Sequence, residues 1–259
     1  MLTEVARAEH LQVAYRKNTV WSDANFDIRR GEFVAVIGPN GAGKTTLFRL
    51  LLGLMRPSQG RLEVFGAPPR RGSRKIGYVP QSHAVDKETN VEAVQLVRLG
   101  FSATRWLPRI AQERAATERA LSSVGATELG KKALGAMSGG ELQRIFLAEA
   151  LAGDPEMLLL DEPLASLDLR RAREMVELID GLVRTRQVTT LLVAHDINPL
   201  IHCLDKVIYI ANGRVATGPP SEVLTTETLS SLYGVRVEVL HDSRGNMVIV
   251  GGEDSHPDA

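Results

Sequence analysis

The chain has 259 residues, 44% of them hydrophobic and 24% charged, a composition typical of a globular protein with a sizeable core. Its 31 basic residues equal its 31 acidic ones, so no overall positive field favours binding to nucleic acid or to an anionic membrane. Cys203 is the single cysteine, which excludes an intramolecular disulfide and favours a reducing compartment. The N-terminus lacks the pattern of a signal peptide, and no run of about 18 apolar residues occurs. We therefore expect a cytoplasmic protein that is held at a membrane, if at all, by another subunit.

Short apolar runs alternate with helical patterns along the chain, which predicts an α/β protein. The segments that favour strands of an antiparallel flank are 11–15, 26–28 and 61–65. The apolar runs that predict buried parallel strands are 33–37, 157–160 and 190–194.

Between about residues 88 and 152 the pattern becomes helical, with apolar residues near i, i+3/i+4 spacing in segments 91–99, 109–124 and 140–151. Because this stretch lies between two predicted core strands, we interpret it as a helical subdomain inserted in one larger domain, residues 1–235. Residues 236–259 form the predicted C-terminal extension. Hairpins are predicted for 207–210 with 214–216, around Asn212-Gly213, and for 235–240 with 247–250. The polar tail, residues 251–259, is expected to be disordered.

The pattern G-x-x-x-x-G-K-T at residues 38–45 directly follows an apolar strand and precedes a helix. Glycines let successive backbone N–H groups converge on phosphates, and the helix N-terminus adds partial positive charge. Lys44 would reach the β- and γ-phosphates of a nucleotide, and the Thr45 hydroxyl would bind Mg²⁺. The expected phosphate-binding residues are Gly38, Pro39, Asn40, Gly41, Ala42, Gly43, Lys44, Thr45 and Thr46. The alternative is a glycine-rich turn that only caps a helix.

This loop and the alternating pattern predict a P-loop NTPase fold, with a RecA-like, mostly parallel α/β core, an antiparallel β flank and the inserted α-helical subdomain. Two carboxylates, Asp161 and Glu162, follow the apolar run 157–160. A carboxylate at the end of a buried strand is costly unless it meets a cation, so Asp161 is the expected Mg²⁺-side carboxylate. Glu162 is the expected base for the attacking water. By themselves these two residues are equally compatible with an ordinary strand end.

Residues 136–144, AMSGGELQR, resemble the signature motif of ATP-binding cassette (ABC) ATPases, and the remaining motifs follow in the order of that family. Tyr15 resembles the aromatic residue that stacks on adenine, and Gln81 the glutamine of the Q-loop. Ser166-Leu167-Asp168 matches the D-loop, and His195 the switch histidine. The resemblance covers residues 2–232. Tyr15 alone would be an ordinary strand aromatic, His195 a hydrogen-bonded polar residue, and Ser-Gly-Gly a helix start.

The resemblance implies a homodimer with two ATP molecules at its interface. Ser138, Gly139 and Gly140 of one copy would contact the γ-phosphate held by the other. The resemblance also implies that Gln81 and Thr45 bind Mg²⁺ directly and that Asp161 binds it through water. Glu162 would be the general base, His195 would stabilise the developing charge, and Lys44 would complete the catalytic set.

Three positions depart from the common family pattern: Glu141, Glu149 and Leu164. Glu141 puts in doubt the side-chain contact across the dimer, but we expect activity to survive all three changes. Residues 81–100, the HDINPL segment at 195–200 and the late segment 233–240 resemble importers for zinc or manganese. The implied partners are membrane permease subunits on the inner face of the plasma (inner) membrane and an extracytoplasmic solute-binding protein, with no nucleic acid. Alternatives are an importer for haem, a siderophore or another small solute, an exporter, and a soluble ABC ATPase acting on DNA or ribosomes.

Overall fold

The computed structural model describes residues 3–16, 18–81, 85–102, 110–165, 167–243 and 245–250. The predicted disordered tail, 251–259, and Ser166 of the D-loop lie outside these residues, as do residues 82–84 of the 81–100 stretch. The chain divides into two compact units. Of the described residues, the first contains residue 3 and those in 29–33 and 70–194, and the second contains those in 4–28, 34–69 and 195–250. The domain boundary predicted at residue 235 stays a prediction.

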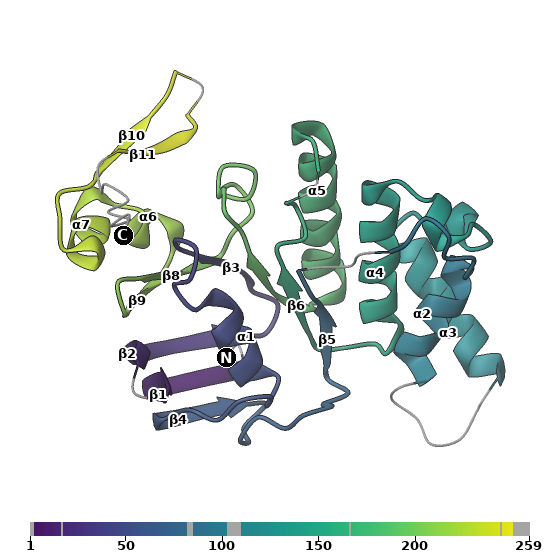
Figure 1. Ribbon diagram of the computed structural model, residues 1–259, viewed down its shortest axis with the longest axis horizontal. Coiled ribbons are helices and arrows are strands. Elements are labelled where there is room, and N and C mark those ends of the chain that lie inside the picture. The colour runs from purple at the N-terminus through teal and green to yellow at the C-terminus, as the bar shows by residue number, and fades with distance from the viewer. Residues whose placement is uncertain are drawn as a thin grey trace. The chain divides into compact units, whose positions relative to one another are not determined.

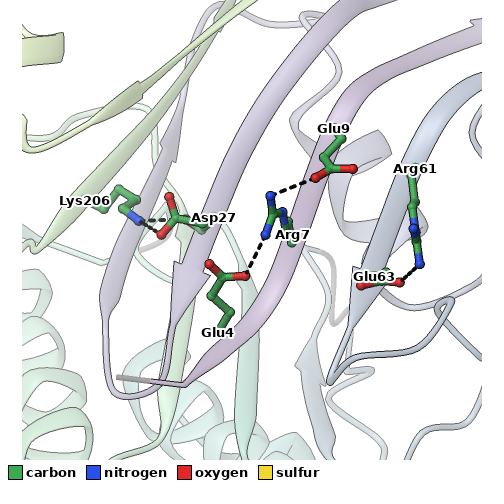
Figure 2. A network of polar contacts seen from close by, with 7 residues as sticks. All are labelled: Glu4, Arg7, Glu9, Asp27, Arg61, Glu63 and Lys206. Carbon is green, nitrogen blue, oxygen red and sulfur yellow. Dashed lines mark hydrogen bonds and ion pairs between the residues drawn. The ribbon is translucent and has the colours of Figure 1, made fainter. Parts of the chain in front are cut away.

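In the second unit, β1 (Glu4–Tyr15), β2 (Asn18–Arg29) and β4 (Gln59–Val64) form a three-stranded sheet in the order β2-β1-β4. The pairing of β1 with β4 is antiparallel, as the sequence predicts, although both β1 and β2 extend well beyond the predicted segments. Buried Ala6 and Ala8 alternate with charged residues on the exposed face. On that face Arg7 lies between Glu4 and Glu9, and Figure 2 also shows the half-buried Asp27 of β2 paired with Lys206, which lies outside this sheet.

The same unit contains β3 (Phe33–Ile37), which is buried throughout and parallel to β8 (Lys206–Ala211). Helix α1 (Lys44–Leu51) follows β3 after a six-residue loop. The predicted hairpin is confirmed, because β8 pairs antiparallel with β9 (Arg214–Gly218). Asn212 and Gly213 both have positive φ, 47° and 73°, which is the requirement of a tight two-residue hairpin turn.

Two short helices, α6 (Pro220–Val223) and α7 (Thr226–Tyr233), lead to the C-terminal hairpin. The hairpin consists of β10 (Glu238–His241) and β11 (Met247–Val250), which pair antiparallel as predicted (Figure 1). The prediction began the first strand at residue 235, three residues before the observed start. The difference has a local cause, since the backbone of Val237 binds the Ser230 hydroxyl through both its N–H and its C=O, each at 3.0 Å.

The first unit contains β5 (Ile76–Val79), β6 (Met157–Asp161) and β7 (Thr189–Val193), which are parallel neighbours in that order. Strands β6 and β7 are buried along their whole length, which agrees with the apolar runs. Helix α5 (Leu169–Arg186) begins at an Asp168 cap and ends at Gln187, which has φ 54°. Neither β5 nor α5 was predicted from the sequence.

The helical character predicted for residues 88–152 is confirmed, while their grouping as a subdomain stays a prediction. Helices α2 (Ala93–Ser102), α3 (Ile110–Ser123) and α4 (Gly139–Ala152) lie within the predicted 88–152 segment, with 3₁₀ turns at Thr127–Leu129 and Leu134–Ala136 (Figure 1). Helices α2 and α4 approach closely at Gly100, where a Cβ atom would lie 2.0 Å from the Glu149 carbonyl oxygen. Among the described residues, no helix has both the length and the apolar character that crossing a bilayer requires.

A methyl group at Gly100 would have to push these two backbones apart. We expect Gly100→Ala to destabilise the protein by about 1–3 kcal/mol, the usual cost of overpacking a core. Gly181→Ala is the matched control, because Gly181 is exposed within α5 and an added Cβ would meet no atom within 4 Å. The control should stabilise by up to about 1 kcal/mol through helix propensity. Urea unfolding of both variants measures the difference, and equal effects would contradict close packing at Gly100.

Candidate functional site

The predicted phosphate loop connects β3 to α1, and its glycines are required by its geometry. Gly38 has φ 146°, and a Cβ there would lie 1.9 Å from the Ile210 carbonyl oxygen. Gly43 has φ 101° and would place a Cβ 2.5 Å from a methyl group of Val20. Only glycine satisfies both the positive φ and the lack of space. The loop is therefore pressed against its own unit at both ends.

The Lys44 ammonium group is folded back over this loop. The residue is only 6% exposed, and Nζ donates to the carbonyl oxygens of Gly38 (2.7 Å) and Pro39 (3.0 Å). Burial of an ammonium group is costly without such partners. Helix α1 begins at Gly43 with no side chain capping its first turn. A buried cation beside an uncapped helix N-terminus fits a phosphate group, by charge and by hydrogen-bond donors.

Tyr15 lies at the end of β1, and the structure brings it to the phosphate-loop helix. Its hydroxyl accepts a hydrogen bond from Arg49 Nη1 at 3.3 Å. Hydrogen bonding to Thr46, and then to Arg49, holds the pKa of the Tyr15 hydroxyl below its ordinary value. The residue is 43% exposed, which is compatible with stacking against a base. Its adenine contact stays a prediction.

His195 follows β7 and belongs to the same unit as the phosphate loop. It is exposed, and so is Asp196 beside it. The Asp196 carboxylate shapes the loop, since its Oδ1 accepts from both the backbone N–H and the side-chain amide of Asn198, each at 2.9 Å.

In the other unit, Asp161 ends β6 and is only 2% exposed, so the strand delivers a buried carboxylate as predicted. Glu162 comes next and has φ 55°, a left-handed conformation that is uncommon for a residue with a side chain. Its backbone N–H donates to the Val193 carbonyl oxygen at 3.2 Å. Such strain persists where surrounding structure holds it, and it is concentrated at functional sites.

Gln81 is brought to Glu162 by a contact that sequence reasoning did not predict. The Gln81 side-chain amide donates from Nε2 to Glu162 Oε2 at 2.7 Å, although 81 positions separate the two residues. Parallel pairing of β5 with β6 makes this possible, because Gln81 follows one strand and Glu162 the other. The amide oxygen of Gln81 is not used by this bond.

The signature segment forms the N-terminus of α4. Ser138 is the N-cap, and its hydroxyl accepts from the backbone N–H of Glu141 at 3.4 Å. Glu141 Oε2 in turn accepts from the Ser138 N–H at 2.7 Å, which completes a capping box. The helix-start interpretation is thus confirmed, and it explains the departure at Glu141. Ser138 and Gly139 are exposed, so this helix N-terminus faces solvent.

Lys132 adds an ion pair that the sequence did not reveal. Its Nζ lies 2.8 Å from both carboxylate oxygens of Glu141. This pairing, with the bond from Ser138, holds the pKa of the Glu141 carboxyl below its ordinary value. Of the other departures, Leu164 is half-buried, and desolvation raises the pKa of the half-buried Glu149.

A hollow of about 270 Å³ lies beside the signature and extends to the first turns of α5. Its polar lining consists of Ser138 and Gly140, the basic residues Arg144 and Arg171, and the acidic residues Glu141 and Glu174. Asp168 of the D-loop caps α5 and pairs with Arg171 at 3.4 Å. The hollow therefore lies next to an exposed helix N-terminus and is bordered by two basic and two acidic side chains.

Lys132→Met keeps the aliphatic stem and removes the charge that holds Glu141. We expect it to lower the free energy of unfolding by about 0.5–1 kcal/mol at pH 7, the usual range for a partly exposed ion pair. Because pairing lowers the folded-state pKa of Glu141, this contribution is present above the unfolded pKa and is lost as pH falls through the folded one.

Urea unfolding of wild type and variant, repeated at decreasing pH, checks this sign. Lys131→Met is the control, because that exposed lysine is the neighbour of Lys132 and should change stability little. A loss that stays constant to acidic pH, or an equal loss in the control, would contradict the ion pair.

Comparison with known proteins places these features in context. Residues 21–165 match the sequence profile of a family described as ABC transporter. The chain is 32% identical, over 96% of its length and 94% of the relative, to the zinc transport system ATP-binding protein TroB of Treponema pallidum. It is 34% identical to the ferric enterobactin transport ATP-binding protein FepC of Escherichia coli, with coverages of 91% and 89%.

The fold is also that of a solved transporter component. One chain of a metal-chelate type ABC transporter in an inward-facing conformation superposes with a TM-score of 0.81 at 27% identity. The match covers 96% of the present chain and 98% of the other. The expected P-loop NTPase fold, with its mostly parallel strands, antiparallel sheet and helices, is therefore confirmed.

Proposed function

The chain belongs to the ABC transporter family as an ATP-hydrolysing subunit, and we propose that it powers import of a divalent metal ion such as zinc or manganese. The observation that carries the catalytic part of this proposal is the hydrogen bond of 2.7 Å between Gln81 and Glu162. It holds the expected base at the end of a buried strand, one residue after Asp161. The sections that resemble zinc and manganese importers, and the similarity to TroB, support the cargo.

Phosphate binding is assigned to the loop from Gly38 to Thr46. Its backbone N–H groups and the Lys44 ammonium would hold the β- and γ-phosphates, and Tyr15 would stack on the adenine. Mg²⁺ fits the hard oxygen donors that the chain offers, namely the Thr45 hydroxyl, the Gln81 amide oxygen and the buried Asp161 carboxylate. When bound, this ion neutralises phosphate charge.

Hydrolysis requires a base for the attacking water. Glu162 would accept the water proton while the oxygen attacks the γ-phosphorus and the bond to the β-phosphate oxygen breaks, which gives ADP and phosphate. The Gln81 amide restrains the Glu162 carboxylate, and a restrained base loses little freedom in the transition state. His195 would donate to the γ-phosphate as negative charge builds up.

The second half of each site would come from another copy of the chain. The N-terminus of α4, at Ser138, Gly139 and Gly140, is capped by residues of its own segment and faces solvent. This arrangement suits a phosphate group that a partner subunit brings to it. Binding ATP would then favour the closed homodimer, and hydrolysis would release it. Glu141 serves the cap and is not needed for that contact.

Permease subunits would hold the dimer on the inner face of the plasma (inner) membrane, and an extracytoplasmic solute-binding protein would deliver the metal. The second candidate cargo is a ferric siderophore, which the 34% identity to FepC favours. The same catalytic residues would serve either cargo, because the permease subunits, and not this chain, would contact it.

Glu162→Gln preserves size and can still accept the hydrogen bond from Gln81. We expect ATP binding to be retained while kcat falls by at least about a hundredfold, the contribution of a general base. The variant should accumulate as a dimer with ATP, measured by light scattering after size-exclusion chromatography. Glu177→Gln, an exposed carboxylate on α5 away from the hollow beside the signature, is the control and should behave as wild type. Wild-type turnover in Glu162→Gln would remove that residue from its role.

The cargo is tested by measuring metal uptake in cells from which the gene for this chain has been deleted. We expect these cells to accumulate less zinc or manganese. A plasmid that encodes the wild-type chain should restore accumulation, and one that encodes Glu162→Gln should not. A multispanning permease should copurify from mild-detergent membranes. Uptake of ferric siderophore that depends on the chain, with unchanged zinc and manganese, would support the second candidate instead. Recovery with ribosomes or DNA alone would overturn transport.

A further inference from the structure

In the part of the chain that the structure describes, the Asn198 side chain joins the loop that carries His195 to the C-terminal hairpin. Its Nδ2 donates to the Met247 carbonyl oxygen at 3.1 Å, and its Oδ1 accepts from the Met247 N–H at 2.6 Å. The Asn198 side-chain amide thus binds both the backbone N–H and the backbone C=O of Met247 in β11, 49 positions away in the sequence.

The backbone N–H and C=O of Met247 both point toward Asn198. Met247 pairs with His241 of β10, but both of its backbone polar groups are directed to Asn198 and therefore away from β10. The Asn198 amide imitates the next strand of the hairpin. Met247 is 7% exposed, so these two bonds are shielded from water on the hairpin side.

The Asn198 side chain also forms a hydrogen bond with Asp196, the residue next to His195. Asn198 Nδ2 also donates to Asp196 Oδ1 at 2.9 Å, and the Asn198 N–H donates to the same oxygen. A chain of hydrogen bonds therefore runs from the Met247 backbone through Asn198 to Asp196. His195 adjoins the last member of this chain.

The hairpin is itself anchored at its other strand. The Val239 N–H donates to the Thr226 hydroxyl at 3.0 Å, and Val237 binds Ser230, so the first strand and its approach are held by α7. The tip is closed by Asp242 and Asn246, which bond to each other through backbone and side chain. The hairpin is therefore held by α7 at its first strand and by the Asp242–Asn246 bonds at its tip, so it can support the loop that carries His195.

We propose that Asn198 is a positioning residue for His195. In this proposal the C-terminal hairpin, through Asn198, holds residues 195–200 in the conformation that His195 needs for ATP hydrolysis. The proposal rests on the proposed role of His195 in hydrolysis. It assigns a catalytic contribution to a segment, 238–250, that contains none of the residues assigned to ATP. A hairpin that moved or was occupied by a partner would then change ATP turnover.

The test is a double-mutant cycle on ATP hydrolysis by the full chain. Asn198→Ala removes the amide, and Met247→Pro removes the N–H that Asn198 accepts while leaving the pairing with β10, because that N–H is not used there. Each should lower kcat roughly three- to ten-fold, as expected for loss of one or two hydrogen bonds, with KM for ATP little changed. The double variant should lose no more than either single one. Met247→Leu keeps the N–H and is the matched control.

Hydrogen exchange gives a readout that general destabilisation would not move. The amides of residues 195–198 and 200 should exchange faster in Asn198→Ala and in Met247→Pro, but not in Met247→Leu, while β3 and β6 stay protected. Unchanged kcat in Asn198→Ala, or additive losses in the double variant, would overturn the proposal. Failure of the proposed function looks different, since His195→Ala would then keep wild-type turnover.

Discussion

Two buried charges constrain this molecule more than any other feature. Lys44 and Asp161 are 6% and 2% exposed, and a buried ammonium or carboxylate is costly unless polar groups or an opposite charge surround it. Asp161 is the last residue of β6, whereas Lys44 is the first residue of α1, after the six-residue loop that follows β3. For Lys44 the polar groups are the carbonyl oxygens of Gly38 and Pro39. Under the proposed function, phosphates and a divalent cation would complete the neutralisation of these two charges.

The phosphate loop and the buried strands were predictable because their signals are local. The glycines, Lys44 and Thr45 occupy the fixed spacing of the phosphate-loop motif. The short apolar runs that precede Gly38 and Glu162 are typical of strands buried inside a sheet. Helix α5 was missed although its buried residues, from Ala172 to Val183, follow the helical period. Strand β5 is four residues long and contains Gly77, so its sequence carries little signal.

The contacts that tune the site could not be predicted in the same way. Lys132 and Glu141 meet because 3₁₀ turns fold the segment between α3 and α4, and Asn198 reaches Met247 over 49 residues. Neither pair leaves a pattern in the chain, since each partner is an unremarkable polar or apolar residue in its own segment. Glu141 shows the consequence: read in isolation it is a departure from a motif, whereas in the structure it completes the cap of the helix that the motif begins.

The backbone conformation of Glu162 has a bearing on how this protein can change. A residue with a Cβ costs about 1 kcal/mol or more in the left-handed region relative to glycine. Replacement of Glu162 by glycine would therefore relieve strain while it removed the carboxylate. With the proposed role of Glu162 as the base, selection for folding alone and selection for turnover pull this position in opposite directions. Under that proposal, a screen for thermal stability that ignores activity would recover variants at this residue that have lost turnover.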